Sequence, residues 1–568
     1  MRIKIHKRNV LCGHRIVILS ILCLFGLSVV YSMKPSKKRK ASGDDRVYLV
    51  HSDELRYDRY GANPDAQIVK GHVSFRHQGA TLTCDSAYFY QALNSVKAFG
   101  HVHFRQGDTL SLDCDHGDYD GQEQMLHARK NVVLKHRRQV LYTDSLDYDR
   151  LYSNAYFFEG GRLIDGKEML SSDWGEYNTE TREAVFFYDV RLTNGNRLVT
   201  TDTLYYDTKT SMAHVVGPSQ ITQDQNVVNT NDGYFDTKSD KARLYSRSTI
   251  VNKNKTITGD SLFHDKATGE SEGFGNVIYV DQENKNELHC GHLVYNENTG
   301  YGYATEEALV KDYSQKDTLF MHSDSMKVYT YNINTDSVYR KVHCYDRVRA
   351  YRTDVQAVCD SLVFNSSDSC MTMYKDPIVW NQGRQLLGEE IKIYMNDSTI
   401  RMAHVIGQSL MVEKVDEEKH FNQISSKEML AFFTDGVLRR TVSAGNVLIV
   451  YYPIDEKDSS IIVMNYSETD TMKMFLSEQR KMEKIWMSKA TGTWYPLSQI
   501  PPSRFHLPQF AWFENIRPRD KYDVFEWRGK TEEEKLKVVE RHAAPLQTIS
   551  SEVQNPVSSS EQKEKANE

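Results

Sequence analysis

The sequence has very little proline over most of its length. Seven of its 12 prolines lie beyond residue 490, so the long stretch before them nearly lacks the residue that strand pairing tolerates least. That stretch also lacks a sustained helical period, which only residues 531–542 carry. Tyrosine is abundant at 34 residues, and aromatic and β-branched residues with alternating polar neighbours favour strands. We therefore expect an all-β fold.

Several functional signatures are missing as well. The first 43 residues hold ten of the 71 Lys and Arg residues and no Asp or Glu, whereas the rest of the chain holds all 77 acidic residues. An acidic body without a basic stripe argues against nucleic acid as a ligand. No CxxC pair, Gly-rich phosphate loop or GxSxG motif occurs. We predict no metal, no cofactor and no enzymatic activity.

Only one apolar run approaches the length of a membrane span. Ile16–Met33 is uncharged and follows five basic residues, which is typical of an export signal. Its length is at the lower edge for a membrane span. A cleaved signal peptide and an uncleaved anchor both fit. The body is expected in the periplasm in either case, tethered to the inner membrane by residues 16–33 if the segment is uncleaved.

A short phrase recurs through the chain: a small residue, Asp, an apolar residue two positions later and an aromatic residue two positions after that. Between Asp115 and Asp260 the step is held at 29 residues, which is the signature of a repeat architecture. The Asp column consists of Asp53, Asp85, Asp115, Asp144, Asp173, Asp202 and Asp260. A second phrase, Gly-Asn/His-Val, lies halfway along each unit, so each unit predicts two strands.

The alternation places the apolar residues of both phrases on one face, and stacked units would align them into stripes. Asp144 is expected on the same face as Leu146 and Tyr148. The stripes are Leu55, Tyr57, Leu146, Tyr148, Leu204, Tyr206, Leu262, Leu293 and Tyr295 from the first phrase, and Val73, Val102 and Val277 from the second. They would line either an open groove or a filled interior, and the sequence leaves both open.

The Asp column is interpreted as structural. Catalytic carboxylate pairs occur once per enzyme, whereas these recur in nearly every unit, and Asp before a turn commonly bonds its own backbone. His72, His101, His214 and His404 likewise occupy repeat positions and form no ligand cluster. Cys84 and Cys114 precede the column Asp. They are interpreted as small residues in a crowded place, with a disulfide between neighbouring units as the alternative.

These two phrases behind an export signal resemble the OstA/LptA family over about residues 47–460, most strongly over 47–280. That family comprises the periplasmic bridge proteins of lipopolysaccharide transport and the matching N-terminal domain of the outer-membrane translocon. The resemblance implies a β-jellyroll with a V-shaped apolar groove for acyl chains, lipopolysaccharide or a related glycolipid as ligand, and edge-to-edge stacking with similar jellyrolls. It implies no catalytic residue.

The chain is expected to divide into four parts. Residues 1–43 are the export segment and its basic linker, and 44–490 are the repeat array, which two jellyrolls dividing near 290–340 would also satisfy. Residues 491–530, rich in proline and aromatics, are expected to cap the array, and 531–568 to form a short helix and a disordered polar tail. The main rival to a lipid carrier is a filled β-solenoid that scaffolds sugar or protein partners. A carbohydrate-active β-helix enzyme is the third hypothesis.

Overall fold

The structure, a computed structural model, describes residues 45–396, 399–416, 419–454, 460–479, 481–529 and 538–539. The predicted export segment lies outside them, as does nearly all of the predicted helix and tail at 531–568. Among the described residues, no helix has the length and apolarity needed to span a membrane. All long elements are strands, and every pairing between them is antiparallel. The predicted all-β repeat fold is therefore confirmed.

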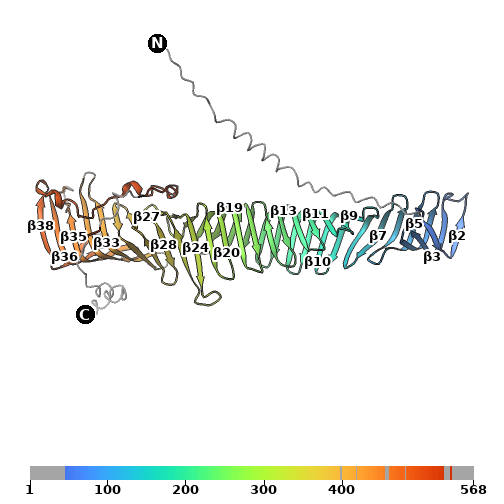
Figure 1. The fold of residues 1–568 in the computed structure, drawn as a ribbon, viewed down its shortest axis with the longest axis horizontal. Coiled ribbons are helices and arrows are strands. Elements are labelled where there is room, and N and C mark those ends of the chain that lie inside the picture. Colours follow the sequence, from blue (N-terminus) through green and yellow to red (C-terminus); the bar gives the residue numbers. More distant parts are fainter. Residues whose placement is uncertain are drawn as a thin grey trace, which may run out of the picture. The chain divides into compact units, whose positions relative to one another are not determined.

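The chain forms two compact units. Unit 1 comprises residues up to 159 together with 176–181, and unit 2 comprises 160–175 and everything from 182 onward. Figure 1 shows the strands of each unit following one another in chain order. The predicted domain limits, including the division near 290–340, stay predictions.

The strands that begin in unit 1 are β1 (Tyr48–His51), β2 (Glu54–Tyr57), β3 (Gln67–His77), β4 (Ala80–Tyr90), β5 (Ser95–Gln106), β6 (Leu110–Asp120), β7 (Met125–His136), β8 (Gln139–Asp149) and β9 (Asn154–Asp165). The long strands that begin in unit 2 are β10 (Glu168–Asn178), β11 (Glu183–Asn194), β12 (Arg197–Asp207), β13 (Met212–Gln223), β14 (Asn226–Asp236), β19 (Glu270–Asp281), β20 (Asn286–Asn296), β33 (Thr399–Lys414), β34 (Phe421–Thr434), β35 (Val437–Tyr451) and β36 (Val463–Leu476).

Shorter elements complete unit 2. Its short strands are β15 (Lys241–Leu244), β16 (Ser248–Asn252), β17 (Lys255–Gly259), β18 (Ser261–Asp265), β21 (Tyr301–Thr305), β22 (Leu309–Asp312), β23 (Leu319–His322), β24 (Ser325–Tyr331), β25 (Tyr339–Tyr345), β26 (Val348–Tyr351), β27 (Val355–Cys359), β28 (Ser361–Asn365), β29 (Cys370–Tyr374), β30 (Ile378–Asn381), β31 (Arg384–Leu387), β32 (Glu390–Asn396), β37 (Met482–Ser488) and β38 (Thr491–Pro496). Four 3₁₀ turns follow: η1 (Leu497–Gln499), η2 (Pro502–Arg504), η3 (Glu514–Ile516) and η4 (Asp523–Phe525).

Two kinds of turn join the long strands. Tight turns such as Gln78 and Gly79 between β3 and β4 have two successive residues with positive φ, as hairpins of this length favour. The turns at the other ends begin with the last Asp of the repeated phrase. Asp149 Oδ1 accepts hydrogen bonds from the backbone N–H groups of Leu151 and Tyr152, at 2.8 and 3.1 Å. Each 29-residue unit therefore returns the chain to its starting side.

The long strands bend at a corner, where the Gly-x-Val phrase of one strand lies opposite the column Asp of the next. In β5 the register slips between Phe99 and Val102, and the skipped residues Gly100 and His101 both have positive φ. A Cβ on Gly100 would lie 2.4 Å from an oxygen of Asp85, so a larger residue there would require the Asp85 side chain to move. These corners explain why the two phrases recur together.

The corner divides a strand into two walls. Wall A consists of the half-strands that meet at tight turns, such as residues 73–77 with 80–84. Wall B consists of those that meet at the Asp turns, such as 125–129 with 145–149. The corner also resets the alternation of side chains. Asp144 is therefore exposed although Leu146 and Tyr148 are buried, and the expectation that all three share a face was wrong.

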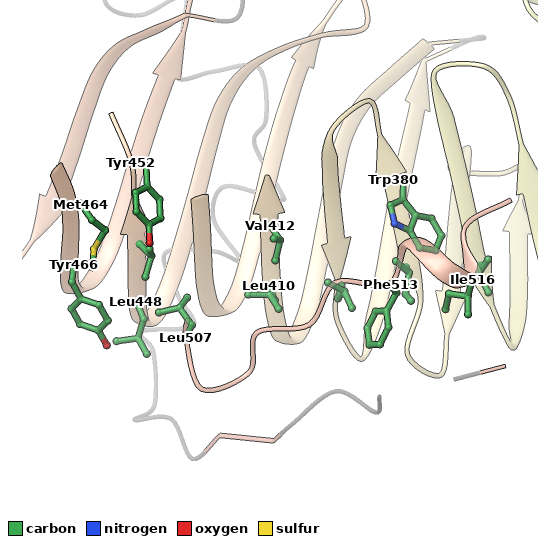
Figure 2. Packing of buried hydrophobic residues seen from close by; sticks show 14 residues of the cluster. Trp380, Leu410, Val412, Leu448, Tyr452, Met464, Tyr466, Leu507, Phe513 and Ile516 are labelled. Carbon is green, nitrogen blue, oxygen red and sulfur yellow. The ribbon is translucent and has the colours of Figure 1, made fainter. Parts of the chain in front are cut away.

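The segment 491–530 was predicted to cap the array. Its residues 497–529 run back along the outer face of wall A in unit 2, and we call them the strap. Figure 2 shows Leu507, Phe513 and Ile516 of the strap beside Trp380, Leu410, Val412 and Leu448. Two buried glutamines fix its backbone. Gln423 bonds the Phe505 carbonyl and the Leu507 N–H group, and Gln385 bonds the Ala511 carbonyl and the Phe513 N–H group.

Candidate functional site

A series of tyrosines closes the interior in the first part of the chain. These tyrosines recur every 29 residues on wall B, and each hydroxyl meets a polar group 41 or 42 residues earlier on wall A. Tyr119 OH lies 2.7 Å from His77 Nδ1, Tyr148 OH donates to Gln106 Oε1 at 3.5 Å, Tyr177 OH lies 2.8 Å from His136 Nδ1, and Tyr206 OH donates to Asp165 Oδ2 at 3.4 Å. The first three pairs belong to unit 1 and the fourth to unit 2. We call them the tyrosine clasps.

The clasps lie in a buried interior. Tyr148 and Tyr206 are 1 % exposed, and burial raises the pKa of the Tyr119, Tyr148 and Tyr206 hydroxyls, which therefore stay protonated and able to donate. Arg150 reinforces the first clasps by donating to Tyr119 OH at 2.5 Å and to Gln106 Oε1 at 3.2 Å. A buried hydroxyl without a partner would be costly, so the clasps hold the two walls together.

The series ends at β14. Phe235 takes the next position after Tyr206 and has no hydroxyl. On wall A, Val199 is fully buried, but its direct cross-strand partner Ile221 is partly exposed. The interior of unit 2 therefore changes from fully buried to partly exposed within one 29-residue repeat of the last clasp.

From Ile221 onward, wall A carries an unbroken line of partly exposed apolar side chains. Each member is the direct cross-strand partner of the next. They are Ile221, Val228, Ile250, Ile257, Tyr279, Leu288, Val310, Met321, Ala350, Ala357, Val379, Leu386, Met411 and Ile424. Adjacent strands lie about 4.8 Å apart. An extended acyl chain that lies along the line would therefore contact its side chains one after another.

Wall B of the same strands carries a matching line. Its members are Tyr295, Val328, Val342, Phe364, Met371 and Ile393, with Gly302 between the first two. Many members of the wall A line and of the wall B line pack against the same buried cluster, which includes Val277, Met326 and Leu362. We call the two lines together the apolar track. Its base is buried and its sides are partly exposed to solvent.

Comparison with known protein families bears on the first part of the chain. Residues 44–202 and 187–260 match the family model described as OstA-like protein. We call residues 44–260 the OstA-like stretch after this match. The match confirms the resemblance seen in the sequence and ends well before the expected limit near residue 460. The OstA-like stretch contains all four clasps, whereas most of the apolar track lies beyond it.

Among solved structures, the chain is similar to LptH of Pseudomonas aeruginosa, described as the LptA homologous periplasmic component of the conserved lipopolysaccharide transport device. The identity is 12 %, the match covers 21 % of this chain and 81 % of LptH, and the TM-score is 0.18. No curated protein matches the chain.

The structure separates the predicted groove residues into three groups. Val73, Val102, Leu146, Tyr148, Leu204, Tyr206, Leu262 and Val277 are buried. Leu293 is half-buried against the base of the apolar track, and Tyr295 is part of the track itself. Leu55 and Tyr57 are exposed on β2. The line of wall A was missed, although an apolar residue two positions after Gly-x-Val, such as Tyr279, signals it.

The column Asp residues lie at the corners and bond across to the facing strand instead of to their own turns. Asp85 Oδ2 lies 2.7 Å from His101 Nδ1, and Asp53 makes the same contact with His72. Asn131 donates to both neighbours, through its side chain to Asp115 and through its backbone to Asp144. Asp260 accepts from Asn276 and Arg247, while Asp173 and Asp202 occupy the same place in β10 and β12.

The cysteines and the remaining histidines offer no reactive group. Cys84 and Cys114 are free, buried thiols, and burial raises their pKa values to about 11 and about 12, so they stay protonated at neutral pH. His214 pairs with Asp232 and His404 with Glu428. Within the described part of the chain, no cluster of His, Cys, Asp or Glu could hold a metal ion.

Proposed function

We propose that the chain is a non-enzymatic periplasmic carrier that holds the acyl chains of lipopolysaccharide, or of a related acylated glycolipid, on its apolar track. The observation that supports this most directly is the unbroken cross-strand line from Ile221 to Ile424. The transfer of one methylene group from water to an apolar surface is favourable by about 0.8 kcal/mol of free energy. A uniform line of such contacts would let a lipid shift along the strands without falling into a deep trap.

The match to an OstA-like family model and the description of LptH as a component of lipopolysaccharide transport are consistent with this proposal. Residues 16–33 would supply export and, if uncleaved, an inner-membrane anchor. Other components would have to drive the movement of the lipid in one direction.

The terminal strands fit a role as a bridge between similar jellyrolls. Leu55 and Tyr57 on β2 are more than half exposed, and Trp486 and Trp494 on β37 and β38 are 48 % and 59 % exposed. Exposed apolar side chains on edge strands mark surfaces that pair with other chains. We expect edge-to-edge stacking at both ends.

The filled-scaffold hypothesis is favoured by a different observation. In the OstA-like stretch, Leu146, Tyr148, Leu204 and Tyr206 are at most 1 % exposed, and the clasps tie the walls together. In this hypothesis the whole chain would recognise sugars or proteins through its outer faces, and the apolar track would hold no lipid.

Site-specific photocrosslinking separates the two functions. A photoreactive residue replaces Leu288 or Val342 on the apolar track, Tyr148 in the sealed interior, or Tyr142 on the outer face of wall A. The carrier predicts lipopolysaccharide adducts at 288 and 342, and none at 148 or 142. Absence of adducts at both track positions in a folded protein would rule out the carrier and leave the scaffold.

A further inference from the structure

An open hollow of about 560 Å³ lies on the outer face of wall B in unit 2. It is lined by Met212, Tyr234, Lys241, Arg243 and Tyr245. Ligand sites typically measure about 300–1,000 Å³ and combine aromatic walls with a few polar groups. The hollow has this composition, with two tyrosine rings, one methionine and two cationic side chains.

The tyrosine rings are held in place by their neighbours. The Tyr234 ring stacks on His214 with centroids 3.9 Å apart and planes 6° apart, and it meets the edge of Tyr245 at 5.9 Å. Asp232 fixes the imidazole of His214 at 2.8 Å. Tyr245 nevertheless remains 47 % exposed. A rigid, exposed ring of this kind offers an apolar surface to a ligand at little entropic cost.

The two cations differ in their partners. Lys241 Nζ lies 2.9 Å from Asp265 Oδ2, so its charge is paired. Arg243 is exposed, stands directly across from Tyr234 in the pairing of β14 with β15, and forms no ion pair within the part of the chain that the structure describes. An arginine fork is suited to bidentate recognition of a phosphate or carboxylate.

The hollow lies on the strands where the clasps end. Tyr234 precedes Phe235, the first position after Tyr206 in the tyrosine series, on the same strand. Met212 and Lys241 are the first residues of β13 and β15, beside the turns that end wall B. The track begins on the other wall of β13 and β14, at Ile221 and Val228, so a molecule whose chains enter it there would pass its polar part over these turns to reach the hollow.

We propose that this hollow binds a phosphorylated saccharide, the head group of the glycolipid whose chains occupy the track. This inference rests on the proposed function for the identity of the ligand. Arg243 binds the phosphate, and the C–H face of the sugar ring packs on Tyr245. The hollow thus sets where on the track a glycolipid docks.

The test measures binding without acyl chains. The probe is lipopolysaccharide stripped of all its acyl chains, titrated calorimetrically into the full exported chain. Arg243→Gln is expected to weaken binding at least tenfold and Tyr245→Ser several-fold. Arg191→Gln, which removes another exposed arginine of unit 2, is the matched control and should bind as the parent does. The same probe after enzymatic dephosphorylation should bind as weakly to the parent as the intact probe binds to Arg243→Gln.

Thermal unfolding checks that each variant is folded. Equal binding by Arg243→Gln and the parent overturns the inference, as does the absence of binding by a folded parent. The photocrosslinking experiment tests the carrier function separately. Adducts at 288 and 342 without saccharide binding overturn only the docking site, whereas Arg243-dependent saccharide binding without such adducts overturns only the carrier.

Discussion

The sealed part of the repeat, from β3 to β12, and the part that carries the apolar track, from β13 to β34, use the same corners and the same two walls. They differ in what stands between the walls. In four successive units of the sealed part, a tyrosine hydroxyl reaches a polar partner across the interior, whereas the first unit has buried Phe89 at that position. In the track, several of the corresponding positions hold partly exposed apolar side chains, such as Val328, Phe364 and Ile393.

This difference shows how one repeat can produce two interiors. The corner, made by the column Asp and the Gly-x-Val phrase, specifies a bent strand in both parts. In the four units with clasps, an aromatic hydroxyl on wall B and a polar group on wall A join the two sides of the bend. Loss of the hydroxyl at Phe235 removes the clasp without disturbing the pairing of β13 with β14.

The largest expected effect comes from placing a carboxylate on the interior of each part. Leu204→Asp puts a charge where the side chain is fully buried, and it should lower the free energy of unfolding by about 4 kcal/mol. Leu288→Asp puts the same charge on the partly exposed track and should cost about 1 kcal/mol or less. Chemical denaturation measures both. Equal costs would mean that the two interiors are equally closed.

The clasps themselves should contribute the next largest effect. Tyr119→Phe removes the hydroxyl that contacts His77 and Arg150 and leaves those buried groups short of a partner. The expected loss is about 2 kcal/mol. Tyr142→Phe, on an exposed tyrosine of the same unit, is the matched control and should change stability by less than about 0.5 kcal/mol. A cost no greater than that of the control would show that the clasps do not hold the walls.

Much of this architecture could be predicted from the sequence. The 29-residue period, the two strands per unit and the position of the corners follow from the column Asp and the glycine phrase. The alternation also places many of the apolar residues inside, as the burial of Leu146 and Val102 shows, although Leu55 and Tyr57 are exposed. Alternation alone, however, cannot say whether an inward side chain meets another wall or remains partly exposed.

The sequence does not reveal contacts between residues that lie far apart along the chain. The partner of Tyr177 is His136, 41 residues away, and only the folded walls bring them together. The strap is a clearer case. Its proline and aromatic content suggested a cap, but its position depends on buried Gln385 and Gln423, which lie more than 80 residues before the backbone groups they bind. Neither glutamine is distinguishable from a surface glutamine in the sequence.

A smaller effect is expected at the corners, which both parts share. Asp144→Ala removes the carboxylate that accepts the Asn131 backbone N–H at 3.2 Å. Because the site is exposed, water replaces part of this bond, and the loss should be about 0.5–1 kcal/mol. Asp260→Ala tests the same corner in unit 2 and should cost a similar amount. Chemical denaturation of both variants checks this, and a much larger cost in one unit would show that the corners are not equivalent.

The smallest expected effect is a dependence of stability on pH at one exposed corner. The hydrogen bond that His101 donates to the Asp85 carboxylate raises the pKa of His101 above its usual value. A raised folded-state pKa means that the stabilisation is fully present below the unfolded pKa of about 6.5 and is lost as the pH rises through the folded pKa. Asn131 and Asn276 occupy the equivalent position at other corners. His101→Asn places the same residue at this corner and should remove the dependence of stability on pH. Nuclear magnetic resonance titration should show the pKa of His101 falling in Asp85→Asn. An unchanged titration there would mean that the histidine corners, unlike the asparagine corners, are held by backbone geometry alone.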